Sequence, residues 1–461
     1  MGKISVNDLK CTSWWFDWSD LQYPAPAVVE RWEKRAEIFA AAGVDCVVTF
    51  GFHFRWDWLN FWERHFSILR KVVEICHKHN IKVIEHHSNQ LTHHIRCEAD
   101  REHIITYQDH HLPLFPDSWD NQIVNGRKLA DWRMISVHDN QPIFINNYKA
   151  EAFCPSNPDY IAEYQKYLQL LIEKTGIDGL MSDDTAFHGD IYSCGCPYCR
   201  ERFKKSAGIE LPPETDRDFW ENHSNPPFLK WIEMRYDITA DFYRQVRAVL
   251  PENMPLLACS CSDSHQYKVR QGCSMEQWSE FMDLIFVEMY HGWDLETDAD
   301  RIITEIAAAS SIADYRKKKA LILSYSDDVK VFQQWADLCA SYGTLTWFSR
   351  QVRKFPVIYE EVTLKDGYPV SQEAVKPYSC GIVYSRRVKN KFNEKELHYF
   401  DALCKTVLSV HNRNMRPQII FDTLRPDKFE YDKIFVPCYD ELDEEFKKWL
   451  TDSKCKIYTE V

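Results

Sequence analysis

The chain has 461 residues, of which 45% are hydrophobic and 14% aromatic, enough for a large buried core and for two or three domains. Its formal net charge of −13 disfavours nucleic acid and anionic membranes as partners, because both are themselves negatively charged. The N-terminal stretch MGKISVNDLKCTSWWFDW lacks the apolar region of a signal peptide, and no apolar run is long enough to span a membrane. The 16 cysteines are therefore expected to be reduced thiols in a cytoplasmic protein.

A pattern of short apolar strand, polar loop and amphipathic helix repeats through most of the chain. Strands are predicted at Leu9–Trp14, Cys46–Phe52, Lys82–His86, Gly179–Asp183, Leu256–Ser260, Leu284–Met289, Ala320–Tyr325 and Thr344–Phe348. Helices are predicted at Val28–Ala42, His65–His79, Tyr160–Thr175, Pro227–Leu250, Ala299–Lys317 and Lys330–Ser341. This alternation indicates an α/β fold with a parallel sheet, and the number of units favours a (β/α)8 TIM barrel over residues 1–375. A doubly wound open sheet is the alternative.

Two segments fall outside this repeat. The insertion Leu91–Pro155 is long and aromatic, and we expect it to cap the mouth of the barrel. After a break near residues 364–379 the strand and helix patterns restart, with predicted helices at Glu394–Asn414 and Asp440–Asp452. They predict a smaller, partial open α/β domain over residues 376–461, of flavodoxin or amidotransferase type. Nucleotide binding is not expected there, because the segment has no glycine-rich phosphate loop.

Polar and aromatic residues crowd the carboxyl ends of the predicted strands, where barrels of this kind place their active sites. Acids, histidines and tryptophans together suit a ligand with many hydroxyl groups, such as a sugar. The candidate substrate contacts are Trp14, Asp17, His53, His86, His87 and Trp347. Further candidate sugar platforms are Trp18, Trp56 and Trp58. The alternative role of each tryptophan is packing in the core.

Three cysteines form a C-x-C-x-x-C pattern at Cys194, Cys196 and Cys199. Zinc bound by thiolates takes four ligands in a tetrahedron, and Cys154, in the segment EAFCPSNPDY, is the candidate for the fourth. A closed four-cysteine site is structural, since it leaves no open position for catalysis. Buried free thiols, a redox pair and a site with only three ligands remain as alternatives.

The stretch from Cys154 to Phe203, FCPSNPDY…LMSDD…CGCPYCRERF, resembles the corresponding stretch of the glycoside hydrolase family 42 β-galactosidases. In that family a C-P-[NS]-[NS]-P-x-Y segment precedes a helix, a strand with a catalytic carboxylate and a C-x-C-x-x-C loop. The resemblance implies a structural zinc held by Cys154, Cys194, Cys196 and Cys199. It also implies that a glutamine-amidotransferase-like trimerisation domain follows the barrel, and hence a homo-oligomer, either a dimer or a trimer.

The catalytic positions depart from that family. Its fourth strand ends in Asn-Glu, whereas this chain reads SDDT at 182–185, and its nucleophilic Glu near the end of strand seven is replaced by SDD at 326–328. The segment DGLMSD instead resembles the strand-four nucleophile of the α-L-fucosidase-like and α-galactosidase-like barrels. In those groups the acid/base comes from around strand six, where this chain has Glu288.

The sequence around these acids fits a division of labour. Glu288 follows four apolar residues, and desolvation there would raise its pKa and keep a proton available, while Asp183 at the polar mouth would stay ionised. We therefore predict a glycosidase that removes a terminal sugar by retention, with Asp183 as nucleophile and Glu288 as acid/base. Asp184 is the alternate for the first role and Asp327 for either. The competing readings are a strand-end acid bonded to a loop or a sugar hydroxyl for Asp183, and a buried salt-bridge partner for Glu288.

Two other functions compete with this prediction. A carbohydrate-binding barrel without catalysis would explain the missing Glu residues. A metal-dependent hydrolase or isomerase would use the histidines of the third strand and its loop, namely His86, His87, His93 and His94. Adjacent residues on a strand point to opposite faces, so at most one of His86 and His87 faces the pocket.

Overall fold

The computed structural model describes residues 9–115, 122–259, 267–289, 293–350, 360–392 and 398–459. One sheet has eight parallel strands: β1 Cys11–Trp15, β2 Cys46–Phe50, β3 Lys82–Ser88, β9 Gly179–Asp183, β10 Leu256–Ala258, β11 Leu284–Glu288, β12 Lys319–Tyr325 and β13 Leu345–Ser349. Their order is β10-β9-β3-β2-β1-β13-β12-β11. Because β10 and β11 at the two ends of this order lie next to each other, the sheet is a nearly closed barrel. The prediction of a TIM barrel is confirmed.

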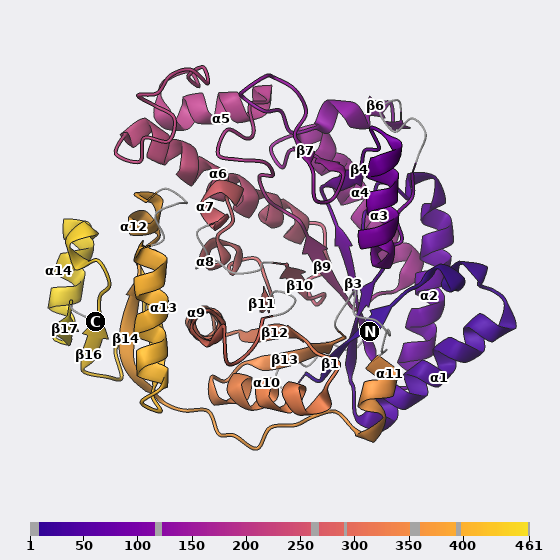
Figure 1. Cartoon of the computed structure of the whole chain (residues 1–461). Helices are drawn as coiled ribbons and strands as arrows, with labels where there is room; N and C mark the ends of the chain where they lie inside the picture. Colours follow the sequence, from indigo (N-terminus) through magenta and orange to yellow (C-terminus); the bar gives the residue numbers. More distant parts are fainter. Residues whose placement is uncertain are drawn as a thin grey trace.

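Helices surround the strands (Figure 1). They are α1 Pro26–Ala42, α2 Trp62–Lys78, α4 Pro158–Thr175, α6 Pro226–Arg247, α9 Ala299–Arg316 and α10 Val329–Ser341. Three of them, α1, α4 and α6, begin with a proline, whose missing N–H costs nothing in the first turn. Gly43 and Gly176 end α1 and α4 in the left-handed conformation that favours glycine. None of the described helices is long and apolar enough to cross a membrane.

Side chains alternate between the inside and the outside of the barrel, as strand geometry requires. In β9, Met181 joins the apolar cluster inside the barrel, whereas Leu180 belongs to the cluster between the strands and the outer helices. The inner cluster includes Cys11, Trp15, Val48, Phe50, Ile84, Leu257, Phe286, Leu323 and Trp347. The inside of the barrel is therefore a packed, largely apolar core.

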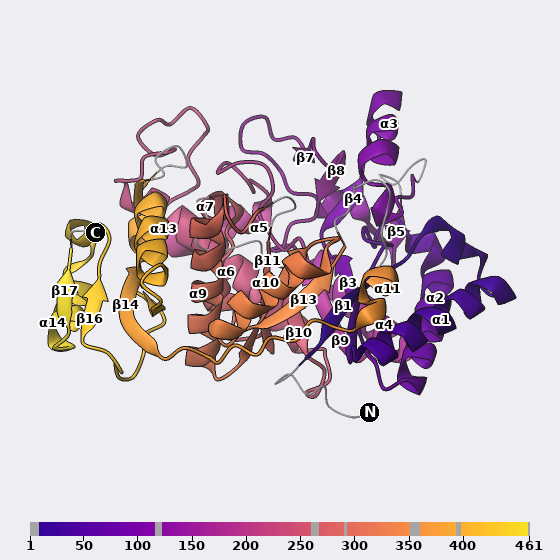
Figure 2. The same cartoon turned by 60° about the horizontal axis from the view of Figure 1, so that its bottom comes forward.

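The insertion after β3 forms a small cap. It contains an antiparallel sheet of β4 Leu91–His93, β8 Ala150–Ala152 and β7 Phe144–Ile145, and the helix α3 Glu98–Tyr107. Figure 2 shows these elements standing above one end of the barrel strands. After β9, a loop with Cys194 and Cys196 leads into α5 Pro197–Ala207, whose first turn carries Cys199. Both insertions lie at the carboxyl ends of strands, where they form walls of a cavity.

The last part of the chain forms a second parallel sheet with the order β15-β14-β16-β17, namely Arg416–Phe421, Tyr378–Tyr384, Lys433–Phe435 and Lys456–Tyr458. Its helices are α12 Arg386–Asn390, α13 His398–His411 and α14 Glu444–Asp452. The first residues of the predicted helix Glu394–Asn414 lie outside the described part of the chain. One apolar cluster joins this sheet to α9 of the barrel, so the two units share a core. This open α/β arrangement is the one predicted, while its assignment to the amidotransferase type stays a prediction.

Candidate active site

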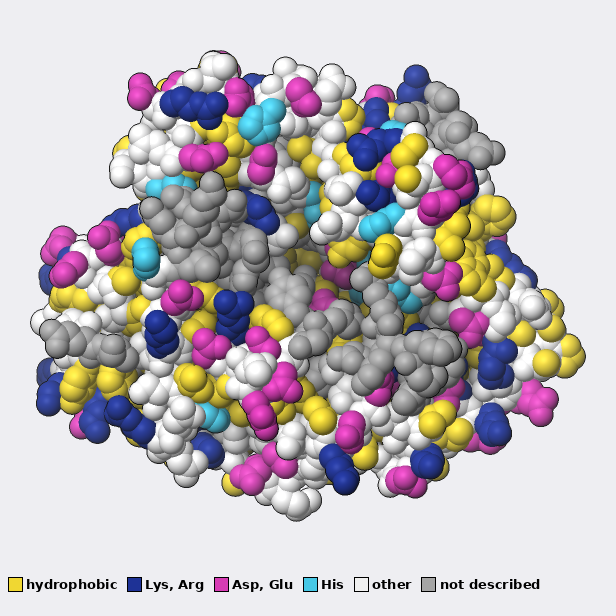
Figure 3. All heavy atoms as spheres, in the orientation of Figure 1, with side chains coloured by type: hydrophobic (Ala, Val, Ile, Leu, Met, Phe, Trp, Pro, Cys, Tyr) yellow, Lys and Arg dark blue, Asp and Glu magenta, His cyan; other side chains and the backbone are white. Residues whose placement is uncertain are grey.

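A cavity of about 730 Å³ lies at the carboxyl ends of the barrel strands, a size typical of small-molecule sites. The face drawn in Figure 3 is hollowed near its centre, where histidine and acidic side chains are visible. The floor is apolar and includes Trp15, Phe50, Met181 and Leu323. The polar lining includes His53, His86, Asp183, Asp184, Glu288 and Tyr325. One wall is residues 144–148 of the cap, and another is residues 184–189 after β9.

Asp183 ends β9 with its side chain turned into this cavity. Its Oδ2 lies 2.9 Å from Nε2 of His86, and its Oδ1 accepts a 2.6 Å hydrogen bond from the backbone N–H of Asp184. Burial alone would raise the pKa of Asp183, but His86, His53 and the backbone N–H outweigh it and hold the pKa below its usual value. Asp183 is therefore a carboxylate across the neutral pH range.

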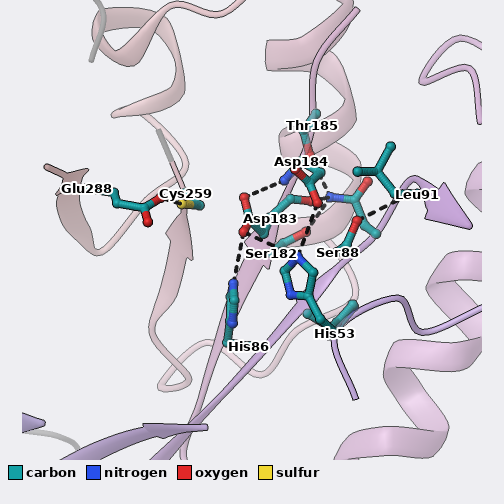
Figure 4. A network of polar contacts seen from close by, with 12 residues as sticks. His53, His86, Ser88, Leu91, Ser182, Asp183, Asp184, Thr185, Cys259 and Glu288 are labelled. Atoms are coloured by element: carbon teal, nitrogen blue, oxygen red, sulfur yellow. Dashed lines mark hydrogen bonds and ion pairs between the residues drawn. The ribbon is translucent and has the colours of Figure 1, made fainter. Parts of the chain in front are cut away.

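Glu288 ends β11, two strands further along the barrel. Tyr325 donates a 2.6 Å hydrogen bond to its Oε1, and the thiol of Cys259 donates to its Oε2 at 3.3 Å. The pKa of Glu288 is raised, first because burial disfavours its charged form and second because the negative charge of Asp183 is near. Figure 4 shows Glu288 and Cys259 on one side and Asp183 with His86 on the other. Two carboxyl groups at one cavity thus have opposite pKa shifts.

Asp184 also faces the cavity, although it follows Asp183 directly. Neighbouring side chains of an extended strand point to opposite faces, and the left-handed backbone of Asp184, with φ of 62°, breaks that alternation. Its Oδ2 lies 3.4 Å from Nε2 of His53. The His53 ring in turn stacks on His111 with 4.5 Å between the centroids. Both aspartates are therefore in contact with histidine.

A buried hydrogen-bond network lies on the other side of the same strands. Arg55 donates from Nη2 to Oε1 of Glu85 at 2.6 Å, and Oε2 of Glu85 lies 2.7 Å from Nδ1 of His87. Nε2 of His87 lies 2.9 Å from the hydroxyl of Tyr164, which is 3.0 Å from Oγ of Ser182. The chain of contacts thus runs from the loop after β2, across β3 and α4, to β9.

The proton positions in this network follow from the contact between Glu85 and His87. Burial lowers the pKa of His87, so the ring is neutral, and the Glu85 carboxylate can only accept, so Nδ1 of His87 carries the proton. Nε2 then accepts from Tyr164. Burial would raise the pKa of Glu85, but His87 and Arg55 hold it below its usual value. Because Glu85 and His87 flank His86 in β3, this network fixes the backbone that carries the cavity histidine.

The cavity brings together five of the predicted site residues, namely His53, His86, Asp183, Asp184 and Glu288. His87 does not join them, because the alternation of β3 turns it outward into the buried network. Asp327 follows β12 and is not among the described residues that line the cavity. Its proposed catalytic role therefore loses its geometric basis.

Three further candidates lie away from the cavity. Trp14 is fully buried against α1, where its ring meets Phe39 edge to face at 6.2 Å. Asp17 accepts a 2.7 Å hydrogen bond from the N–H of Ser19 and caps the short helix Trp18–Gln22. Trp347 lies inside the barrel below the floor, with its indole N–H donating to Ser13 at 3.0 Å. The structure gives these residues packing and capping roles in place of substrate contact.

Other lining residues were missed by the sequence reasoning. Trp15 lines the cavity one position after Trp14, and the period-two alternation of β1, with Cys11 inside the barrel, could have identified it. Tyr325 could have been found in the same way, as the last residue of β12 after the inward Leu323. His110 and His111 come from the cap insertion, where no periodic pattern predicts which side chains face the barrel.

The four predicted metal ligands gather beside this region, and they are Cys154, Cys194, Cys196 and Cys199. The Cys154 sulfur lies 3.5 Å from that of Cys199 and 3.6 Å from that of Cys196. Sulfurs around one zinc at about 2.3 Å are about 3.8 Å apart, so the group fits a tetrahedral metal site. Burial raises the pKa of the Cys154 thiol, so such thiolates need a cation beside them. Backbone N–H groups of Ile135 and Ser156 donate to two of the sulfurs, as expected around bound thiolates.

The other histidines of the third strand and its loop do not form a metal site together. Nδ1 of His93 lies 2.5 Å from Oδ2 of Asp57, and Nδ1 of His94 lies 2.7 Å from Oε1 of Glu151. His86 alone of the four lines the cavity. The metal-dependent reading based on this run of histidines is therefore not supported by their positions.

No protein-family model and no curated protein matches the chain. Solved structures do match it. A catalytic mutant of Gan42B, a GH42 β-galactosidase from G. stearothermophilus, has a TM-score of 0.69 at 14% identity over 98% of this chain and 70% of that one. The β-galactosidase from the haloarchaeon Halorubrum lacusprofundi has a TM-score of 0.66 at 13% identity, over 96% and 71%. The β-galactosidase from Marinomonas ef1 has a TM-score of 0.64 at 11% identity, over 97% and 75%. The chain therefore shares the fold of these β-galactosidases, a (β/α)8 barrel followed by a smaller α/β unit.

Proposed function

We propose that this chain is a retaining glycoside hydrolase that removes a terminal sugar, with Asp183 as nucleophile and Glu288 as acid/base. The observation that carries the proposal is the opposite pKa shift of the two carboxyl groups at one cavity. His86 and the Asp184 N–H lower the pKa of Asp183 and favour its carboxylate, whereas burial and the charge of Asp183 raise the pKa of Glu288 and favour its protonated form. Glycoside cleavage needs one carboxylate and one carboxylic acid on either side of the scissile bond. The fold it shares with the GH42 β-galactosidases adds support.

The proposed reaction has two steps, and in each step Asp183 and Glu288 have separate roles. An oxygen of Asp183 attacks the anomeric carbon, the bond from that carbon to the leaving oxygen breaks, and Glu288 gives its proton to that oxygen. Water then enters, Glu288 takes a proton from it, and the resulting hydroxide displaces Asp183 from the sugar. The second step restores both groups to their starting protonation states.

The identity of the sugar that is cleaved has to be determined by experiment, and galactosidase and fucosidase activities are the leading candidates. Aryl glycosides of α- and β-D-galactose and of α-L-fucose should be compared with the other common sugars on the wild type. Asp183→Asn should lower kcat by at least about a thousandfold on the sugar that is cleaved. Full activity in this variant would exclude Asp183 as nucleophile, and no cleavage of any glycoside by the wild type would favour the carbohydrate-binding function.

Azide separates the two roles. Asp183→Ala leaves room for azide to displace an activated aryl leaving group once, which gives a glycosyl azide of inverted configuration. Glu288→Ala still forms the enzyme ester, and azide then displaces Asp183, which gives the retained configuration. The same configuration from both variants would contradict the assignment of roles. An inverted product from the wild type with water would replace retention by inversion.

We also propose that the four-cysteine group holds zinc and is structural. The sulfur spacing and the two N–H donors support a closed tetrahedral site with no position for substrate. Elemental analysis of the purified protein should give about one zinc per chain. A reduced environment such as the cytoplasm fits the fifteen free cysteines of the described residues. Assembly into a dimer or trimer is a further proposal, which light scattering tests.

A further inference from the structure

We propose that the cavity contains a second, reversible site for a divalent cation such as Zn²⁺, formed by His53, His86 and Asp183, and that the bound ion blocks the cavity. Asp184 is placed to supply a fourth ligand. The proposal of the cation site is based on the positions of these four side chains. Only its inhibitory effect rests on the proposed glycosidase function.

The donor atoms already converge. Nε2 of His86 lies 2.9 Å from Oδ2 of Asp183, and Nε2 of His53 lies 3.9 Å from the same oxygen. One ligand atom from each of the three residues falls within a group whose members are all within 4.8 Å of one another. Nitrogen and oxygen ligands on a tetrahedral zinc are about 3.4 Å apart, so small side-chain movements complete the geometry. Figure 4 shows His86 below Asp183 and His53 below Asp184.

The ligands come from the ends of three neighbouring strands of the barrel, β2, β3 and β9. His86 belongs to β3 and Asp183 to β9, which pair in parallel with His86 opposite Met181 and Ser88 opposite Asp183. His53 follows β2, where its carbonyl accepts a 2.9 Å hydrogen bond from the N–H of Ser88. Both imidazoles are buried, with His53 6% and His86 3% exposed. The three side chains are thus held in place before any ion arrives.

Charge and access favour a cation here. Two adjacent carboxylates, Asp183 and Asp184, meet two imidazoles and no described Lys or Arg side chain within salt-bridge distance. All four residues line the same cavity, so an ion can enter with its remaining water ligands. Imidazole and carboxylate together suit borderline divalent ions such as zinc better than calcium or magnesium, which prefer oxygen ligands.

The surroundings also limit the affinity. A metal-bound histidine usually donates its second ring N–H to an acceptor, which fixes the tautomer. In the part of the chain that the structure describes, Nδ1 of His53 and Nδ1 of His86 have no hydrogen-bond partner. Binding through Nε2 also breaks the contact between His86 and Asp183. We infer an exchangeable ion, held more weakly than the ion of the four cysteines.

An ion at this place would inhibit the proposed reaction. It would bind the Oδ2 lone pair of Asp183, which the reaction needs for attack on the anomeric carbon. It would also occupy the space of the sugar ring. Zinc should therefore compete with the glycoside, and a chelator should restore activity.

Calorimetry on the full chain tests the site without any substrate. After dialysis against a chelator, elemental analysis is expected to retain about one zinc per chain in the cysteines. Titration with ZnCl2 should then give one more equivalent. His53→Gln and His86→Gln should each weaken this second binding at least about tenfold, with circular dichroism as the check on folding. Unchanged binding in both folded variants would overturn the proposal.

A surface histidine provides the matched control. His138 is 40% exposed, with Nε2 3.1 Å from Asp190 and Nδ1 3.5 Å from Glu214, so it is a histidine beside two carboxylates outside the cavity. His138→Gln should leave the second zinc and the activity unchanged. Loss of the second zinc in this variant would place the ion at the surface and overturn the cavity site.

The inhibition measurement separates this proposal from the proposed function. With a glycoside that is cleaved, zinc should raise the apparent KM and leave kcat unchanged. Activation by zinc, or inhibition that substrate does not relieve, would overturn the blocking role. If no glycoside is cleaved, the calorimetric titration still decides whether the cation site exists.

Discussion

The hydroxyl of Tyr325 donates a 2.6 Å hydrogen bond to Oε1 of Glu288, at the ends of neighbouring strands. A donor stabilises the carboxylate, so this bond lowers the pKa of Glu288 and partly offsets the effect of burial. Tyr325→Phe should therefore raise that pKa further. If Glu288 is the general acid, the basic limb of the kcat profile moves to higher pH, and kcat itself falls because the weaker acid is a poorer proton donor.

A tyrosine at the other end of the barrel is the control. Tyr368 is half-buried below the strands, where its hydroxyl donates to the carbonyls of Cys11 and Thr346. Tyr368→Phe also removes partly buried hydrogen bonds but should leave both limbs of the pH profile in place. A basic limb that does not move in Tyr325→Phe would show that another group controls it.

His86→Leu should move the acidic limb of the pH profile of kcat/KM to higher pH. The contact with His86 lowers the pKa of Asp183, and the proposed mechanism needs the ionised form for attack on the sugar. Its loss raises the pKa, so activity falls at a pH about one unit higher than in the wild type. His138→Leu at the surface serves as the comparison. An unchanged acidic limb with a normal fold would separate His86 from the ionisation of the nucleophile.

The sequence predicted the barrel well because strand, loop and helix signals repeat, and each predicted strand overlaps an observed one. From the predicted strand ends it also predicted that Asp183 and Glu288 lie at one cavity, and both line it. It failed for Trp14 because a one-residue difference in strand phase exchanges the inner and outer faces, and Trp15 occupies the cavity. The network of Arg55, Glu85 and Tyr164 joins residues far apart in the chain, which no local pattern reports.

Tyr164→Phe tests whether that network positions β3 and β9, the strands that carry His86 and Asp183. The variant keeps the ring but removes the hydroxyl that joins His87 to Ser182, the neighbour of Asp183. The free energy of unfolding should fall by about 1 kcal/mol, and kcat should fall with little change in KM. Tyr368→Phe is again the matched control. Equal losses of kcat in both variants would reduce the role of Tyr164 to general stability.

Glu85→Gln tests the buried charge pair behind β3. Arg55 and Glu85 are both about fully buried, and the neutral amide leaves the guanidinium without its counter-charge. The free energy of unfolding should fall by about 3–5 kcal/mol at neutral pH. Glu98→Gln, in the exposed pair with Arg101, should change it by less than about 1 kcal/mol.

The same substitution has a pH signature. The folded-state pKa of Glu85 is lowered, so its contribution to stability is complete above the unfolded pKa of about 4.3 and is lost as the pH falls toward the folded value. The difference between wild type and Glu85→Gln should therefore stay constant from pH 7 to about pH 5 and shrink below about pH 4.3, as measured by urea unfolding between pH 7 and about pH 2. A difference that stays constant down to about pH 2 would mean that Glu85 is not charged in the folded protein.

If the four-cysteine group holds the proposed zinc, Cys196→Ser should abolish its binding and destabilise the loop between β9 and α5. The hydroxyl is a poor zinc ligand, and the remaining buried thiols lose the cation that stabilises their ionised forms. We expect zinc to fall from about one equivalent to near none and the thermal midpoint to fall sharply. Cys339→Ser, at a fully buried thiol in α10, measures the cost of the substitution alone, about 0.5–3 kcal/mol. Equal destabilisation of the two variants, with zinc retained in Cys196→Ser, would contradict the metal site.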